Sequence, residues 1–333
     1  MKRVLSLLLC LMLVVSMAGC GSSTHAPETT TEAPAQTQSP EEQAVIRVLA
    51  IGNSHTNDAT NLLYEVFHAE MPEQKVLIGN MYYSGCPVSK HVNFAQSDAP
   101  EYEYKKNDSG KWSSMEGTTL SYALREQAWD MIILHEMNTH AVQESTYATD
   151  NLQVLIDYVK ANTYYPVEFV YHMPWANPVD ETFFAPDYDP QPPGSWVENY
   201  QTGFGLNYDA MFTKLIQMSQ TYVMPHEDIV GVIPAGTAIQ YANNALDQAD
   251  TDLYRDYTHL SDFGRLIAAY VWYASITGQT EITEVNVDVI PASLRHRRAQ
   301  SLGDLEITEE MKQVIIQAVN YALANPWTLP TAQ

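Results

Sequence analysis

The chain has 333 residues, of which 45% are hydrophobic, and it carries 40 acidic against 17 basic side chains, for a formal net charge of −23. This composition indicates a soluble, folded protein with a substantial core. It argues against nucleic acid as a partner, because phosphate binding needs clustered Lys and Arg. The three cysteines supply neither a Cys-rich zinc site nor a disulfide framework.

The N-terminal segment has the pattern of an export signal. Lys2 and Arg3 precede an apolar run over 4–15, which is shorter than the ~20 residues that span a bilayer, and small residues lead to Cys20. The segment resembles a bacterial lipoprotein signal. This resemblance implies a lipid on Cys20 that anchors the protein to a bacterial membrane, outside the cytoplasm; ordinary secretion with cleavage nearby is the alternative.

The sequence divides into a signal, a tether and one domain. The signal covers 1–19 and would be removed. Residues 20–44 are rich in Ser, Thr, Pro and Glu and lack apolar bulk, so we predict a disordered tether. The remainder, 45–333, shows no internal repeat and no convincing boundary, and we predict a single domain.

Short apolar runs alternate with helix-like segments along this domain. Helices are expected where apolar residues recur at three- and four-residue steps. The alternation predicts an α/β fold, a three-layer α/β/α sandwich around a parallel sheet of about five strands. The predicted strands cover 45–51, 75–81, 130–134, 168–172 and 229–232, and the predicted helices cover 59–68, 118–127, 150–162, 207–221, 261–276 and 309–324. A small hairpin over 102–112 and a long loop over 173–205, rich in Pro and aromatic residues, interrupt the pattern.

Ser54 ends a Gly-Asn-Ser turn directly after the first predicted strand. Ligands of open parallel sheets bind beyond the carboxyl ends of the strands, so this position favours a role in binding or catalysis. A serine hydroxyl needs an imidazole to take its proton and a carboxylate to orient that imidazole. Asp256 and His259 supply both from one short loop. We predict a triad of Ser54, His259 and Asp256; a helix-capping serine and a solvated loop histidine are the alternatives.

These motifs resemble the SGNH/GDSL hydrolase superfamily over most of residues 45–278. The turn at Ser54 is similar to the first block of that family, with Asn53 in place of the usual Asp, and the Asp-x-x-His segment matches the last block. The resemblance implies a flavodoxin-like α/β/α sandwich and ester hydrolysis without a cofactor.

The two middle blocks of that family match less evenly. Ser84-Gly85-Cys86 is similar to the second block, which implies that the backbone amides of Ser54 and Gly85 stabilise an oxyanion. The usual Gly-x-Asn of the third block is replaced by Leu134-His135-Glu136-Met137-Asn138. His135 and Asn138 are therefore competing candidates for the remaining oxyanion or substrate contact, and His135 is alternatively a buried histidine at a strand end.

A metal site is not predicted around His135. Its neighbour His140 is five positions away, whereas two ligands on one helical face must be four apart, as in His-Glu-x-x-His.

The long loop carries aromatic residues that suit sugar rings. Trp175 and Trp196 are candidate stacking platforms, although packing of the loop against the sheet explains them equally well. With the export signal, they favour the O-acyl or O-acetyl groups of carbohydrates as the ester substrate. A surface lipoprotein that binds a glycan or solute without turnover is the alternative from another class, and a metallohydrolase is a further one.

Overall fold

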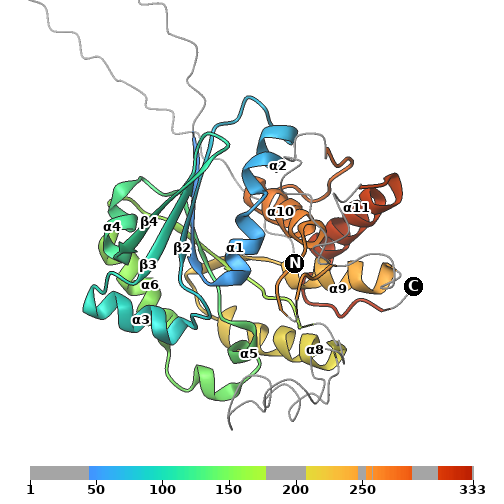
Figure 1. Cartoon of the computed structure of the whole chain (residues 1–333). Helices are drawn as coiled ribbons and strands as arrows, with labels where there is room; N and C mark the ends of the chain where they lie inside the picture. The colour runs from blue at the N-terminus through green and yellow to red at the C-terminus, as the bar shows by residue number, and fades with distance from the viewer. Residues whose placement is uncertain (1–44, 178–207, 247–252, 257, 287–306, 332–333) are drawn as a thin grey trace, which may run out of the picture. The chain divides into compact units, whose positions relative to one another are not determined.

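Seven strands form one sheet, in the order β4-β3-β2-β1-β5-β6-β7, in the computed structural model of the protein (Figure 1). The structure describes residues 45–177, 208–246, 253–256, 258–286 and 307–331. The strands are β1 (Ile46–Gly52), β2 (Val76–Tyr82), β3 (Tyr102–Asn107), β4 (Trp112–Thr118), β5 (Met131–Leu134), β6 (Glu168–His172) and β7 (Ile229–Ile233).

The five predicted strands form the parallel part of the sheet. β1 pairs in parallel with β2 on one side and with β5 on the other, and β6 and β7 extend the sheet beyond β5. From Val48 onward β1 is buried on both faces, which explains its continuous apolar sequence. The predicted α/β class is confirmed.

The sheet has seven strands instead of about five, because the predicted hairpin joins it. β3 pairs antiparallel with β2, and β4 pairs antiparallel with β3 at the edge. Tyr102 and Tyr104 are buried on one side of β3, while Glu103 and Lys105 are half-buried. This alternation is typical of a strand with one covered face.

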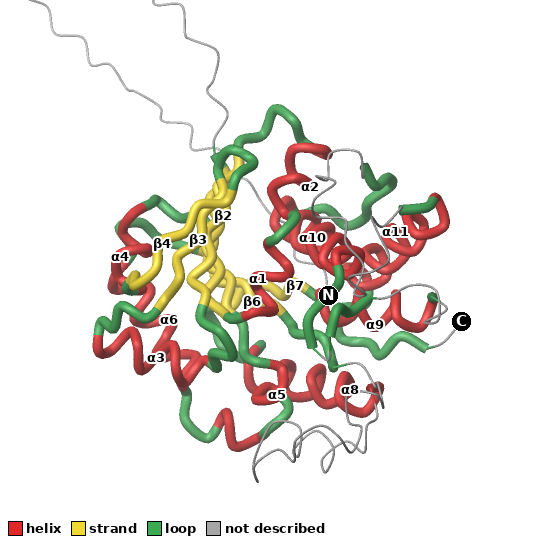
Figure 2. The backbone as a smooth tube through the Cα atoms, viewed as in Figure 1, coloured by secondary structure: helices red, strands yellow, loops and turns green. Residues whose placement is uncertain are grey.

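Helices cover both faces of the sheet. They are α1 (Ser54–Thr60), α2 (Leu63–Glu70), α3 (Val88–Ser97), α4 (Leu120–Glu126), α5 (Asn138–Ala141), α6 (Asn151–Asn162), α8 (Tyr208–Met218), α9 (Ala235–Ala245), α10 (Asp262–Thr277) and α11 (Glu309–Ala324). Two short helical turns, η1 (Glu144–Tyr147) and η3 (Ser219–Val223), lie among them. Figure 2 shows α3, α4 and α6 on one side of the strands and α1, α2, α9, α10 and α11 on the other.

The helix predicted over 59–68 is wrong at its beginning. The chain becomes helical at Ser54, and α1 and α2 are separate helices. The sequence of α1 is polar, so it lacks apolar periodicity, yet five of its seven residues are buried. His55, Thr56 and Asp58 make hydrogen bonds to distant segments instead of apolar contacts, which is why a search for apolar periodicity missed this helix.

Gly52 permits α1 to begin immediately beside the end of β1. A Cβ atom at this position would lie 2.5 Å from a side-chain carbon of Thr56, one turn into α1. Only a glycine leaves room for this approach, so Gly52 fixes Ser54 at the carboxyl edge of the sheet.

The described residues contain no helix whose length and apolar character would let it cross a membrane. The predicted signal over 1–19, the tether over 20–44 and the lipidation candidate Cys20 all lie outside the described residues.

Candidate functional site

Asn53 links the turn that carries Ser54 to the loop that carries Gly85. It caps α1, with its side-chain oxygen accepting a hydrogen bond from the amide of His55 at 3.0 Å. Its side-chain nitrogen donates to the carbonyl of Cys86 at 3.1 Å. An Asp at this position would lack this donor, so the amide side chain of Asn53 adds a bond between the two loops.

The amides of Ser54 and Gly85 are placed to receive a negative charge. Ser54 is the first residue of α1, where backbone amides have no partner within the helix. Gly85 has a φ of +58°, a left-handed conformation that favours glycine, and it is exposed. Within the described part of the chain neither amide donates a hydrogen bond to a protein acceptor.

Asp256 and His259 are joined as the sequence predicts. The His259 ring donates through Nδ1 to the carboxylate at 2.8 Å, and the amides of Thr258 and His259 donate to the same carboxylate at 3.0 and 2.8 Å. Burial alone would raise the pKa of Asp256, but these hydrogen bonds outweigh burial and lower it to about 2. The carboxylate is therefore ionised at any assay pH and orients the imidazole through Nδ1.

A cavity of about 180 Å³ brings these groups together. Its lining includes Ser54, Gly85, Asn138, Asn177, Thr258 and His259. These side chains are small or polar, Met137 adds an apolar side chain, and among the described residues no aromatic ring other than histidine lines the cavity. Of the three predicted triad residues, Ser54 and His259 thus line one cavity, at the end of β1 and on the loop before α10, and Asp256 is hydrogen-bonded to the His259 ring behind it.

The two candidates for the third contact differ in position. Asn138 lines the cavity, but its side-chain nitrogen already donates to the carbonyl of Trp175 and to the side-chain oxygen of Asn177, at 3.2 and 2.7 Å. His135 is 1% exposed and does not line the cavity. Its Nδ1 contacts the carbonyl of His172, in agreement with the alternative of a buried histidine at a strand end.

The expectation that Trp175 stacks on a sugar ring is wrong. Trp175 is 0% exposed, its ring is stacked on His55 at 4.1 Å, and its indole nitrogen donates to the carbonyl of Thr258 at 2.9 Å. Aromatic content alone did not separate a packed ring from an exposed one. Trp196, the second predicted platform, lies outside the described residues.

Three buried histidines, His55, His135 and His172, lie next to one another, and His55 also lines the cavity. The ring centroids of His55 and His135 are 5.5 Å apart, and those of His135 and His172 are 4.9 Å apart. Burial lowers the pKa of each ring, to about 4 for His135, so the cluster is neutral. Among the described residues no three His, Cys, Asp or Glu side chains are arranged to hold a metal ion.

Three residues of the site were not found from the sequence. His55 and Asp58 belong to the polar helix α1 and contact the loop of His259, as described below. Asn177 lines the cavity after β6. The only sequence feature that could have indicated these three residues is that each is polar and follows a buried strand within a few positions.

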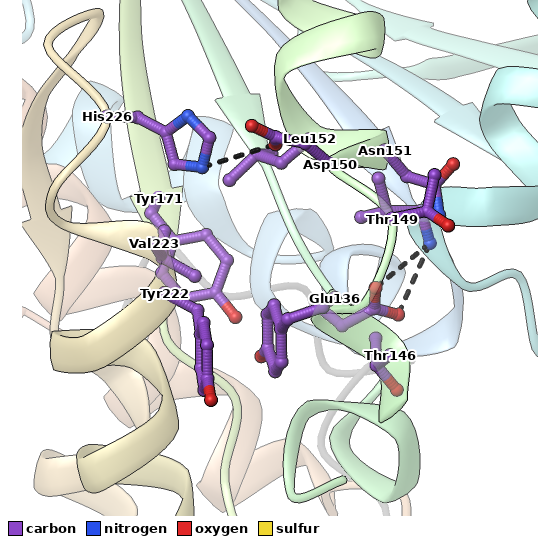
Figure 3. A pocket seen from close by; sticks show the side chains of 12 residues that line it. Glu136, Thr146, Thr149, Asp150, Asn151, Leu152, Tyr171, Tyr222, Val223 and His226 are labelled. Carbon is purple, nitrogen blue, oxygen red and sulfur yellow. Dashed lines mark hydrogen bonds and ion pairs between the residues drawn. The ribbon is translucent and has the colours of Figure 1, made fainter. Parts of the chain in front are cut away.

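A second cavity of about 140 Å³ adjoins the same loops (Figure 3). Glu136, Tyr147 and Tyr222 line it, and the two tyrosine rings stack at 4.7 Å. The Glu136 carboxylate is 4% exposed and accepts hydrogen bonds from the amides of Val88, at the start of α3, and Met137. Through these hydrogen bonds Glu136 connects the loop after β5 to the end of the loop that carries Gly85.

Cys86, the residue after Gly85, is a buried free thiol. It is 0% exposed, and burial raises the pKa of its thiol to about 12. Because a thiol attacks iodoacetamide as its thiolate, this reagent at pH 8 is expected to leave Cys86 unmodified. Peptide mass mapping checks the modification. Alkylation of Cys86 in the folded protein, with loss of activity, would show that this loop opens.

A family model described as a domain of unknown function (DUF4886) matches residues 47–303. A crystal structure of a DUF4886 family protein from Bacteroides uniformis ATCC 8492 is 24% identical, with a TM-score of 0.67, over 86% of this chain and 98% of that chain. A member of the lipolytic protein G-D-S-L family from Veillonella parvula DSM 2008 is 15% identical, with a TM-score of 0.42, over 70% of this chain and 99% of that chain. No curated protein matches the sequence.

Proposed function

The chain belongs to the DUF4886 family, and from the arrangement of its Ser54 cavity we propose that it is a serine hydrolase of the SGNH/GDSL kind that cleaves carboxylic esters. The observation that carries this proposal is the convergence of Ser54 and His259 on one cavity, with Asp256 accepting a 2.8 Å hydrogen bond from the ring of His259. The nucleophile, the base and the group that orients the base are the minimum set for acyl transfer from an ester to serine.

In the proposed reaction, the Ser54 hydroxyl oxygen attacks the acyl carbonyl while Nε2 of His259 takes its proton. The negative charge that develops on the carbonyl oxygen is stabilised by the amides of Ser54 and Gly85, each worth ~3 kcal/mol by analogy with measured oxyanion holes. The ester C–O bond then breaks, and His259 returns the proton to the leaving alkoxide. Water, deprotonated by His259, attacks the acyl-Ser54 ester and releases the acid.

The proposed substrate carries a short acyl group, such as acetyl, on a hydroxyl of a carbohydrate. The small volume of the cavity supports a short acyl group over a fatty acyl chain. The N-terminal sequence supports an enzyme that is tethered outside the cytoplasm through Cys20 and meets glycans there. No stacking platform is assigned for the sugar, since Trp175 is buried.

Covalent labelling of Ser54 tests the proposal. A fluorophosphonate probe is expected to add one phosphonyl group to the intact protein, on the peptide that contains Ser54, and 4-nitrophenyl acetate is expected to be hydrolysed. Ser54→Ala should abolish both, whereas Ser113→Ala, on the exposed edge strand β4, should change neither. Labelling or turnover that survives Ser54→Ala would remove Ser54 from its role. Absence of both in the wild-type protein would favour a lipoprotein that binds without turnover.

A further inference from the structure

Asp58 lies on the helix that begins with Ser54 and is fully buried. It stands four positions after Ser54, so both side chains project from the same side of α1. Its side chain is 0% exposed although it carries a carboxylate. A buried carboxylate is tolerated only where partners compensate its charge, so its partners identify what it holds.

All partners of the Asp58 carboxylate lie in or beside the loop that carries the proposed base. One oxygen accepts from the guanidinium groups of Arg255 at 2.8 Å and Arg265 at 2.9 Å. The other oxygen accepts from the backbone amide of Leu260 at 2.9 Å. Arg255 directly precedes Asp256, and Leu260 directly follows His259. The carboxylate thus accepts hydrogen bonds from both ends of the segment that contains Asp256 and His259.

A second contact runs from α1 to the middle of the same segment. Nε2 of His55 lies 3.1 Å from the hydroxyl of Thr258, and Trp175 covers the His55 ring while it donates to the carbonyl of Thr258. The segment is also closed on itself, because the amide of Arg255 donates to the carbonyl of His259 at 3.0 Å. The helix of the nucleophile therefore contacts the segment of the base at its start, its middle and its end.

We propose that Asp58 is a positioning residue that sets the geometry between the Ser54 hydroxyl and the His259 imidazole. This inference rests on the proposed function. Its physical basis is that α1 carries Ser54 rigidly at the end of β1, while Asp256 and His259 stand on a loop that needs external anchors. Two guanidinium groups and one amide, all directed at a single buried carboxylate, provide a short and stiff connection between the two.

Kinetics of two matched variants test this role. Asp58→Asn keeps the shape of the side chain but removes the charge that holds Arg255 and Arg265. Asp262→Asn removes another ion pair of Arg265, whose Nη1 lies 3.0 Å from Asp262. We expect Asp58→Asn to lower kcat for 4-nitrophenyl acetate about 100-fold with KM within twofold, because misplacement of reacting groups by ~1 Å costs about that much. Asp262→Asn is expected to keep kcat within twofold.

Three further readouts separate positioning from folding. Phosphonylation of Ser54 should slow by the same factor as kcat, and the NMR signal of the His259 Nδ1 proton should shift or broaden in Asp58→Asn but not in Asp262→Asn. If Asp58→Asn does not fold, Thr258→Val, which removes the hydroxyl that contacts His55, is expected to lower kcat at least threefold without change in melting temperature.

Two results would overturn the proposal. One is a kcat for Asp58→Asn that stays within twofold of that for Asp262→Asn, and the other, where Asp58→Asn does not fold, is an unchanged kcat for Thr258→Val. Either result with Ser54→Ala inactive would leave the esterase proposal standing and reject only the role of Asp58. Activity that survives Ser54→Ala would reject the esterase proposal itself.

Discussion

Replacing His259 with Ala is expected to lower kcat for an ester substrate about as far as replacing Ser54 with Ala, by roughly 10⁶-fold, and the double variant is expected to fall no further. The physical reason is that the hydroxyl and the imidazole act as one unit. Without the base, the serine keeps its proton, and without the serine, the base has nothing to deprotonate. What remains is the contribution of the two oxyanion amides and of substrate binding, about 10³- to 10⁴-fold over water.

Steady-state rates with 4-nitrophenyl acetate measure this prediction. His68→Ala is a matched control, because His68 is an exposed histidine on α2, away from the cavity. Its rate should equal that of the wild-type protein. Losses that multiply in the double variant would show that Ser54 and His259 act independently, which a shared proton transfer does not allow.

The parallel strands could be predicted from the sequence because burial on both faces leaves a continuous apolar run. The position of the hairpin could not, since its alternating residues indicate one covered face but not which strand it joins. Only the pairing of β3 with β2, as between Met81 and Tyr104, settles that, and it depends on the three-dimensional path of the chain.

The candidate site was predictable where its chemistry is local. Asp256 and His259 are three positions apart, and Ser54 directly follows a strand. Both the spacing and the position of the serine can therefore be recognised in the sequence alone. The supporting contacts are non-local. Asp58 and Arg255 are 197 positions apart, and nothing near either residue in the sequence indicates the other. The burial of Trp175 could not be predicted either, because the residues that cover its ring come from α1 and from the loop of His259, which are far from it in the sequence.

Glu136 is expected to make the stability of the protein depend on pH. Burial raises its pKa to about 8, against the hydrogen bonds from the amides of Met137 and Val88, which lower it. The folded state therefore keeps a proton that the unfolded state has released above pH ~4.5. Since the folded state binds the extra proton, the free energy of unfolding falls as pH rises between about 4.5 and 8, by at most 1.4 kcal/mol per pH unit from this group.

Glu136→Gln removes this proton equilibrium and is expected to flatten the pH dependence. Urea unfolding between pH 5 and 9 measures it: the wild-type protein should lose on the order of 4 kcal/mol more stability over this range than the variant does. Glu144→Gln is the matched control, because Glu144 is exposed on η1 and its substitution should leave the wild-type slope. Parallel curves for wild type and Glu136→Gln would mean that the carboxylate is already ionised at pH 5. The hydrogen bonds from the amides of Val88 and Met137 would then fully offset the cost of burying the charge. The contact between the loops after β2 and β5 would be made by an ionised carboxylate over the whole pH range of the experiment.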